Sequence, residues 1–239
     1  MFKSQYADSN GQNGFATNTL KIFNENTVRY GLVSIFEHRM KEAQTKGERT
    51  RQFIIEKTAP IFNVKGFAGT YLSDLTEATG FTKGAIYCNF ENKDEVALAA
   101  FDYNFGRVTE YVATRIRAQE NAVDRLLVYP KIYRDFLKIA ILQMGCPILN
   151  TSTEADDTHP QLKAKAADAL QFWKKAIENQ VKRGIERKEI KGDTNPTEVA
   201  VLVMAMIEGA MMQAKVTNRS TELRVAMNYL EKIIEELRP

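Results

Sequence analysis

The sequence is poor in the residues on which many functional sites depend. Its 239 residues include two cysteines, Cys88 and Cys146, two histidines, His38 and His159, and a single tryptophan. Two cysteines are too few for a disulfide framework and fit a reducing compartment. No Cys or His spacing resembles a metal site, and no catalytic grouping is visible. We therefore expect neither a disulfide-rich secreted protein nor an enzyme, and we expect no metal and no cofactor.

Long hydrophobic segments are also lacking. The longest apolar run, Val199 to Ile207, ends at Glu208 and is far shorter than the roughly 20 residues that span a membrane. An early lysine is followed by polar sequence, so no secretory signal is visible. These features predict a cytoplasmic protein without a membrane partner. The formal net charge of +3 is only mildly basic and does not by itself suggest nucleic acid.

Residues 45–96 carry the most informative pattern. Their first part favours a helix that starts at Thr45, with Glu48 as its capping-box partner, and stops at Gly66. The spacing of one buried helical face is shown by Ile54, Thr58, Ile61 and Phe62, with Ile55 and Ala59 beside them.

A second helix and a tight turn follow. Thr70 can cap this helix, whose inward residues would be Leu72, Leu75 and Ala78. Gly80 stands where the chain must turn with positive φ.

The third helix has an unusual first turn. Thr82 is well placed as its cap, but Lys83 faces the positive end of the helix dipole, and Gly84 costs about 1 kcal/mol relative to alanine. Both residues make sense if this helix end lies against a polyanion, because a missing side chain permits close approach and a lysine reaches a base edge or phosphate. Ile86 and Phe90 then return to the core.

The next helix start shows the same feature. Asn92 with Glu95 reads as a cap and its partner, yet Lys93 places a cation at an N-terminus, where a phosphate would satisfy both lysine and helix dipole. The short helix, the glycine turn and the second short helix together predict a helix-turn-helix that enters a groove of double-stranded DNA.

Several short motifs stand in a fixed order along this region. They are Thr50-Arg51, Gly66-Phe67, Asp74-Leu75, Ala78, Thr79-Gly80-Phe81-Thr82, Lys83-Gly84, Ile86-Tyr87, Phe90 and Lys93. This order resembles the TetR family of bacterial transcriptional repressors. The sequence departs from the family at Pro60, which is expected to kink or loosen the first helix, and at Cys88, a position that the family often fills with glycine or histidine.

The resemblance implies which residues contact DNA. The DNA side of the recognition helix would hold Thr82, Lys83, Gly84, Ala85 and Tyr87, and Lys93 would hold a phosphate; we add Thr70, at the start of the second helix. Alternatively, Tyr87 packs on the first helix, and Lys83 and Lys93 are ordinary solvated charges.

The first 39 residues have a different composition. Residues 8–19 are rich in small and polar residues and are expected to be flexible, whereas residues 28–36 favour a short apolar helix or strand. Members of the family commonly begin a few residues before the first helix, and Met40 stands at that place. We interpret residues 1–39 as a flexible N-terminal extension or a misassigned start; the alternative is an arm that contacts DNA or a second subunit.

Beyond Val96 the chain reads as helix after helix, so we expect an all-α protein. Residues 40–96 would form a three-helix helix-turn-helix DNA-binding domain, and residues 97–239 a larger helical ligand-binding and dimerisation domain. The first two expected helices of the second domain cover residues 97–119 and about 121–143, and a break at Gly145 and Pro147 and a loop to Asp157 follow. Three more helices are expected: one from Pro160, one from the Asn195 cap with Pro196 and Glu198, and one from Leu223 to Leu237.

The last two helices suggest a homodimer. Leu223, Met227, Leu230, Ile234 and Leu237 stand at nearly heptad intervals. Two such adjacent helices can pair with their copies across a two-fold axis into a four-helix bundle, and TetR-type repressors dimerise in this way on palindromic operators. The alternative is that both helices close the core of a monomer.

Large apolar residues of the second domain are candidates for a ligand pocket. A carboxylate on so apolar a helix needs a partner or a polar ligand, although it can equally be exposed at the edge of a dimer, and the apolar residues can equally be plain core. The candidates are Phe101, Phe105, Phe136, Trp173, Met204, Glu208, Met211 and Met212.

A second set of residues resembles one branch of the family. It comprises Gly145-Cys146-Pro147, Asn150, Glu154, Asp157 and Gln213-Ala214-Lys215, and the branch includes the N-ethylmaleimide-responsive repressor. There the cysteine is implicated in sensing electrophiles or oxidants, and a lysine beside a thiol lowers its pKa. The alternatives for Cys146 are inert packing and a regulator that senses a noncovalent ligand.

The sequence as a whole predicts a transcriptional repressor. It would bind a palindromic operator as a homodimer and be released by a small-molecule inducer or by thiol modification. The alternative is a helical ligand-binding or structural protein that retains the fold without DNA binding.

Overall fold

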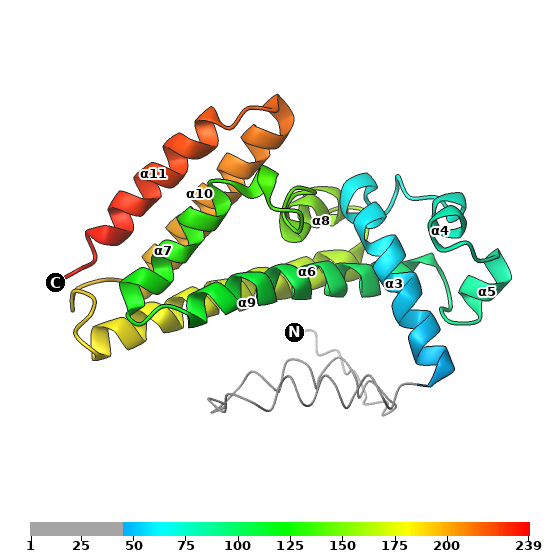
Figure 1. Ribbon diagram of the computed structural model, residues 1–239, viewed down its shortest axis with the longest axis horizontal. Helices are drawn as coiled ribbons and strands as arrows, with labels where there is room; N and C mark the ends of the chain where they lie inside the picture. Colours follow the sequence, from blue (N-terminus) through cyan, green and yellow to red (C-terminus); the bar gives the residue numbers. More distant parts are fainter. Residues whose placement is uncertain (1–44) are drawn as a thin grey trace, which may run out of the picture. The chain divides into compact units, whose positions relative to one another are not determined.

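The computed structural model describes residues 45–239, and the expected N-terminal extension with Met40 lies outside these residues. The described part is built from helices, without a strand (Figure 1). In chain order they are α3 (Lys46–Lys65), α4 (Leu72–Thr79), α5 (Lys83–Tyr87), α6 (Lys93–Arg117), α7 (Ala122–Tyr133), the 3-10 helix η1 (Phe136–Lys138), α8 (Pro147–Ala155), α9 (Pro160–Glu186), α10 (Pro196–Thr217) and α11 (Thr221–Glu235). The all-α prediction is confirmed.

The head formed by α3, α4, α5 and the start of α6 has its own small core. α3 packs against both α4 and α6, and the buried side chains of this core are Ile54, Ala59, Phe62, Leu75, Ile86, Phe90, Val96, Ala97 and Ala100. Further along α6, Phe101, Val108 and Val112 belong to a second, larger core. The predicted domain boundary after Val96 therefore falls inside one continuous helix that links both cores.

The larger core is enclosed by α6 to α11. α6 and α9 lie side by side, and α10 packs against α7, α9 and α11 (Figure 1). α10 is long and apolar enough to cross a membrane by length and composition, but Ala200, Val203 and Ile207 on one of its faces are buried in this core. α8 lies between the two parts of the molecule and contacts α3, α6 and α9.

Most helix ends follow the local signals in the sequence. The side chains of Thr82, Asn92 and Asn195 accept hydrogen bonds from backbone amides of the following turn, as their cap positions predict. Gly66 and Gly80 have φ values of 72° and 71°, the left-handed conformation that ends α3 and α4. α3 continues through Pro60 to Lys65, so this proline does not end the helix.

Three local predictions were wrong. Thr70 does not cap α4: the cap is Tyr71, whose amide donates to Asp74, while the Thr70 hydroxyl donates to the carbonyl of Gly66. The helix predicted over residues 121–143 ends at Tyr133, because burial of Phe136 and Leu142 folds the following chain into η1 and turns. The loop predicted before residue 157 is the helix α8, which starts with Pro147 in the first turn, where proline is tolerated.

Candidate nucleic-acid interface

The short helix α5 presents its first turn to solvent. Thr82, Lys83 and Gly84 are exposed, and the Ala85 amide donates to the Thr82 hydroxyl oxygen at 3.2 Å. On the opposite side Ile86 is fully buried in the head core. The head thus holds a helix of five residues so that its N-terminal end faces outward, which suits a recognition helix.

Gly84 is not required by the packing of the protein. A Cβ atom at this position would meet only the Thr82 hydroxyl oxygen, at 4.0 Å. The unfavourable helix propensity of glycine therefore has no internal structural reason here, unlike that of Gly80, whose φ is positive. A missing side chain on an exposed cationic turn favours close approach of another molecule.

Lys83 and Tyr87 lie together on the surface of α5. The Lys83 ammonium is 5.9 Å from the centre of the Tyr87 ring, a weak cation–π distance. Tyr87 is half-buried and packs against the head core, so part of its ring serves the packing that the alternative interpretation expects. Ala85 is also half-buried beside it.

Thr70 and Lys93 have structural roles that the sequence did not show. Thr70 is fully buried, so its side chain is not available for the predicted DNA contact. The Lys93 ammonium donates to the carbonyls of Phe67 and Thr70 at 2.8 and 3.0 Å and lies 4.0 Å from the centre of the Phe67 ring. Lys93 thus ties the start of α6 to the loop between α3 and α4, and any phosphate contact would be an additional one.

Arg51 is a positioning residue that sequence reasoning missed. Its guanidinium donates to the Asn89 carbonyl, forms an ion pair with Glu95 at 2.6 Å and lies 3.9 Å from the centre of the Phe90 ring. It therefore fixes the chain that leaves α5 against both α3 and α6. The sequence signal was Thr50-Arg51, but nothing in the sequence identifies the acceptors, which are distant along the chain.

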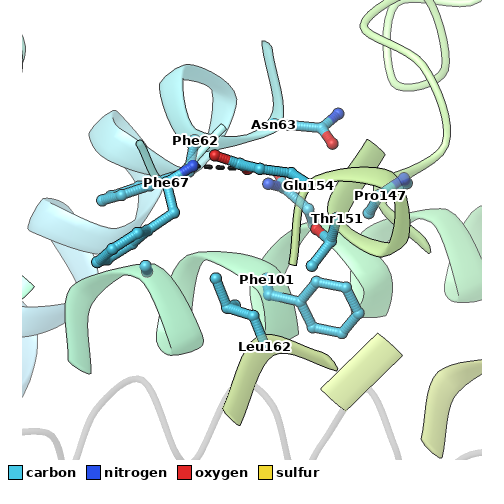
Figure 2. Close-up of a pocket in the computed structure, with 10 residues that line it drawn as sticks. Phe62, Asn63, Phe67, Phe101, Pro147, Thr151, Glu154 and Leu162 are labelled. Carbon is cyan, nitrogen blue, oxygen red and sulfur yellow. Dashed lines mark hydrogen bonds between the residues drawn. The ribbon is translucent and has the colours of Figure 1, made fainter. Parts of the chain in front are cut away.

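Glu154 on α8 fastens the head to the larger domain. Its two carboxylate oxygens accept from the amides of Phe67 at 2.8 Å and Ala68 at 2.7 Å, directly after Gly66 (Figure 2). Beside it is a small cavity of about 20 Å³, room for about one water molecule. The cavity is lined by Phe62, Asn63, Phe67, Ala97, Phe101, Asn104, Pro147, Thr151, Glu154 and Leu162.

A second polar tie joins α3, α8 and α10. Asn150 donates to the carbonyls of Asn63 and Met144, and Asn63 donates to the Gly145 carbonyl at 3.3 Å. The Lys215 ammonium completes the group by donating to the Met144 carbonyl at 2.8 Å. Gly145, Asn150 and Lys215 of the second resemblance are therefore brought together, but around backbone carbonyls.

The apolar pocket candidates are mostly core residues. Phe101 is the one that lines the small cavity, and it stacks on Phe105 with ring centres 6.2 Å apart. Phe136, Trp173 and Met211 are buried, whereas Phe105 and Met204 are half-buried and Met212 is exposed. Glu208 differs from all of these, because both of its carboxylate oxygens are buried without a hydrogen-bond partner of good geometry.

The surroundings of Cys146 do not favour an activated thiol. Cys146 is buried, and burial together with the nearby Glu208 carboxyl raises the pKa of its thiol well above the ordinary value. Lys215 is close enough to interact with Cys146, but burial lowers the pKa of Lys215, and its ammonium donates to Met144. A protonated, buried thiol reacts slowly, because the thiolate is the nucleophile.

Comparison with known proteins identifies the family of the chain. Residues 54–100 match the bacterial regulatory proteins of the tetR family, and residues 122–230 match the tetracyclin repressor-like C-terminal domain. The crystal structure of a TetR-family transcriptional regulator from Cytophaga hutchinsonii is 46% identical, with a TM-score of 0.77, over 82% of this chain and 98% of that one.

Two curated relatives are more distant. The HTH-type transcriptional regulator TtgR of Pseudomonas putida is 26% identical over 71% of this chain and 82% of its own length. The HTH-type transcriptional repressor NemR of Escherichia coli K12 is 23% identical over 77% and 94%, so it supports a particular branch only weakly. These relatives are regulators of transcription and not enzymes. The protein belongs to the TetR family of DNA-binding transcriptional regulators.

Proposed function

We propose that this protein is a homodimeric repressor that binds a palindromic operator through α5 and is released by a noncovalent inducer. The observation that carries the proposal is the exposed first turn of α5, where a cap, a lysine and a glycine with open space above it stand together. In this position Lys83 reaches phosphate or a base edge, while Gly84 allows the helix end to approach the groove.

An exposed apolar surface on α10 and α11 supports a dimer. The heptad residues of α11, such as Leu223 and Leu230, are fully buried and close the core of the subunit itself. A different set of apolar side chains stays exposed on the same two helices, and monomers rarely leave such a surface uncovered. It consists of Val201, Leu202, Met212, Val216, Val225 and Tyr229. Pairing of this surface with its copy would give a four-helix bundle.

Release of DNA would follow from movement of α8. A repressor dimer binds two half-sites only when its recognition helices have the spacing of successive major grooves. Because Glu154 holds the loop after Gly66, a ligand that prefers a shifted α8 would also prefer a shifted head. We favour a noncovalent inducer over thiol modification, since the Cys146 thiol is buried and protonated.

Fluorescence anisotropy with DNA from upstream of the protein's own gene tests the proposal. A Lys83→Ala variant is expected to bind more weakly and to lower the slope of log K against log salt by about one, because about one phosphate contact is lost. Lys175→Ala, an exposed lysine on α9, is the matched control and should bind as the wild type does. Equal binding of the Lys83 variant and the wild type would contradict a DNA contact by Lys83. Absence of specific binding by the wild type would favour the alternative, a helical ligand-binding or structural protein that retains the fold without using DNA.

A further inference from the structure

Glu208 and Gln180 leave acceptor oxygens unsatisfied inside the larger domain. Within residues 45–239, both carboxylate oxygens of Glu208 and the Oε1 atom of Gln180 are buried without a hydrogen-bond partner of good geometry, and the group beside Glu208 is the Cys146 thiol, a weak donor. Leaving buried acceptors in this state is costly, and native structures contain few of them. Each of these oxygen atoms lacks a hydrogen-bond donor of good geometry.

The surroundings of these atoms are aromatic. Tyr129 lies against Gln180, and the rings of Tyr129 and Tyr133 lie 6.3 and 6.2 Å from Trp173. Tyr133 also lies close enough to Glu208 for the carboxylate to raise the pKa of its hydroxyl, although burial raises it more. Glu208, Gln180 and these three rings are called the Glu208 cluster below.

The cluster contains acids and no opposing base. The groups that interact with Glu208 are Cys146 and Tyr133, and both are acids that become negatively charged when they ionise. Lys215 is engaged with the Met144 carbonyl. Burial raises the pKa of Glu208 to about 7, so a proton neutralises much of its charge at neutral pH. A bound cation would replace that proton and supply donors at the same time.

We propose that the Glu208 cluster is the recognition site for a small organic cation with N–H donors, namely a primary or secondary ammonium on an apolar group. This inference rests on the proposed function, since the ligand would be the inducer. The ammonium pairs with the carboxylate of Glu208, and the rings of Tyr133 and Trp173 provide the faces that attract cations. The Oε1 atom of Gln180 accepts from a second donor of the ligand.

The position of Cys146 links this site to the head. Cys146 lies beside Glu208 and is the cap residue before α8, after a stretch of turns that follows η1. Irregular backbone on this side can move without breaking a helix. A ligand that inserts beside Glu208 displaces Cys146 and with it the start of α8, whose Glu154 holds the loop of the head.

Trp173 makes the site directly observable. It is the single tryptophan of the chain, so its fluorescence reports on the Glu208 cluster in the full-length protein. Titrations at pH 8 would use benzylammonium, benzyltrimethylammonium, which has no N–H donor, and neutral benzyl alcohol. We expect benzylammonium to bind at least about tenfold more tightly than either of the others, because it alone supplies both charge and donors.

Two variants sharpen the test. Glu208→Gln removes the charge in nearly the same volume and should reduce benzylammonium affinity about tenfold or more while leaving benzyl alcohol unchanged. Glu198→Gln makes the same change at an exposed position of α10 and should leave both affinities unchanged. Thermal unfolding of each variant verifies that it is folded.

The outcomes separate the two proposals. Fluorescence that does not respond to any of the probes, or a Glu208→Gln variant that binds benzylammonium as the wild type does, overturns the cation site. Operator binding measured by anisotropy in the same samples is a separate readout. If operator binding is observed without cation binding, the repressor proposal stands and the cation site is lost. If cations bind but operator DNA does not, the cation site stands and the repressor proposal is lost.

Discussion

Glu208→Gln should remove a pH-dependent loss of stability. Burial raises the pKa of Glu208 in the folded protein from 4.5 to about 7. Between these two values the folded protein holds the proton and the unfolded chain does not, so the free energy of unfolding falls as the pH rises through this interval. Above about pH 7 the Glu208 carboxyl is ionised in both the folded and the unfolded state, so the free energy of unfolding no longer changes with pH through this group. The gap between the pKa values corresponds to about 3 kcal/mol, an upper bound because the amide of glutamine is also polar.

Urea unfolding followed by Trp173 fluorescence measures this effect. The wild type and Glu208→Gln would be compared from pH 5 to pH 8 at one protein concentration, because the proposed dimerisation would make apparent stability depend on concentration. The two free energies should be similar near pH 5, and the variant should become more stable by up to about 3 kcal/mol at pH 8. Glu198→Gln, the exposed control, should show no such trend. A difference between Glu208→Gln and the wild type that stays constant with pH would refute the assignment of a buried, uncompensated carboxyl.

Three further predictions concern the thiols, the α8 tie and the dimer. In an anisotropy assay, N-ethylmaleimide should abolish DNA binding of the wild type but not of Cys88→Ser, because Cys88 is exposed at the end of α5 and the Cys146 thiol is buried. Loss of DNA binding in both proteins would restore Cys146 as a sensor. Glu154→Gln should destabilise the protein by about 2 kcal/mol in urea unfolding, since two charge-assisted hydrogen bonds to amides are weakened, and an unchanged midpoint would contradict the tie. Val216→Asp should shift the protein to monomer in size-exclusion chromatography with light scattering, whereas Val64→Asp, exposed on the head, should not; identical elution of both would argue against the α10–α11 surface.

The features that could be predicted from the sequence depend on neighbours along the chain. A cap such as Thr82 or Asn195 bonds to amides two or three residues away, and Gly80 needs only its own backbone freedom. Helical faces follow the same logic, because burial repeats every three or four residues. These signals were sufficient for the ends of α5 and for the courses of α9 and α10.

Features that depend on distant partners could not be predicted. Threonine is a common N-cap residue, but the Thr70 hydroxyl donates a hydrogen bond to the carbonyl of Gly66 instead. Lys93 looks like a phosphate contact because the carbonyls that hold it belong to the loop between α3 and α4. Cys146 was expected to be activated by Lys215, whereas burial and the carboxyl of Glu208 raise the pKa of its thiol. In each case the residue type indicated a polar interaction, but the sequence around the residue did not identify the partner.

The position of α8 explains how a buried carboxyl could matter to DNA binding. α8 begins at Cys146, next to Glu208 on α10, and Glu154 in its last turn holds the amides after Gly66. A nine-residue helix is stiff, so a displacement at its first turn is carried to its last one. The same helix contacts α6, whose first residues belong to the head core and whose later residues belong to the larger core. An inducer of the proposed kind would therefore not have to reach the head. It would only have to stabilise one position of α8 over another, by the difference in its affinity for the two.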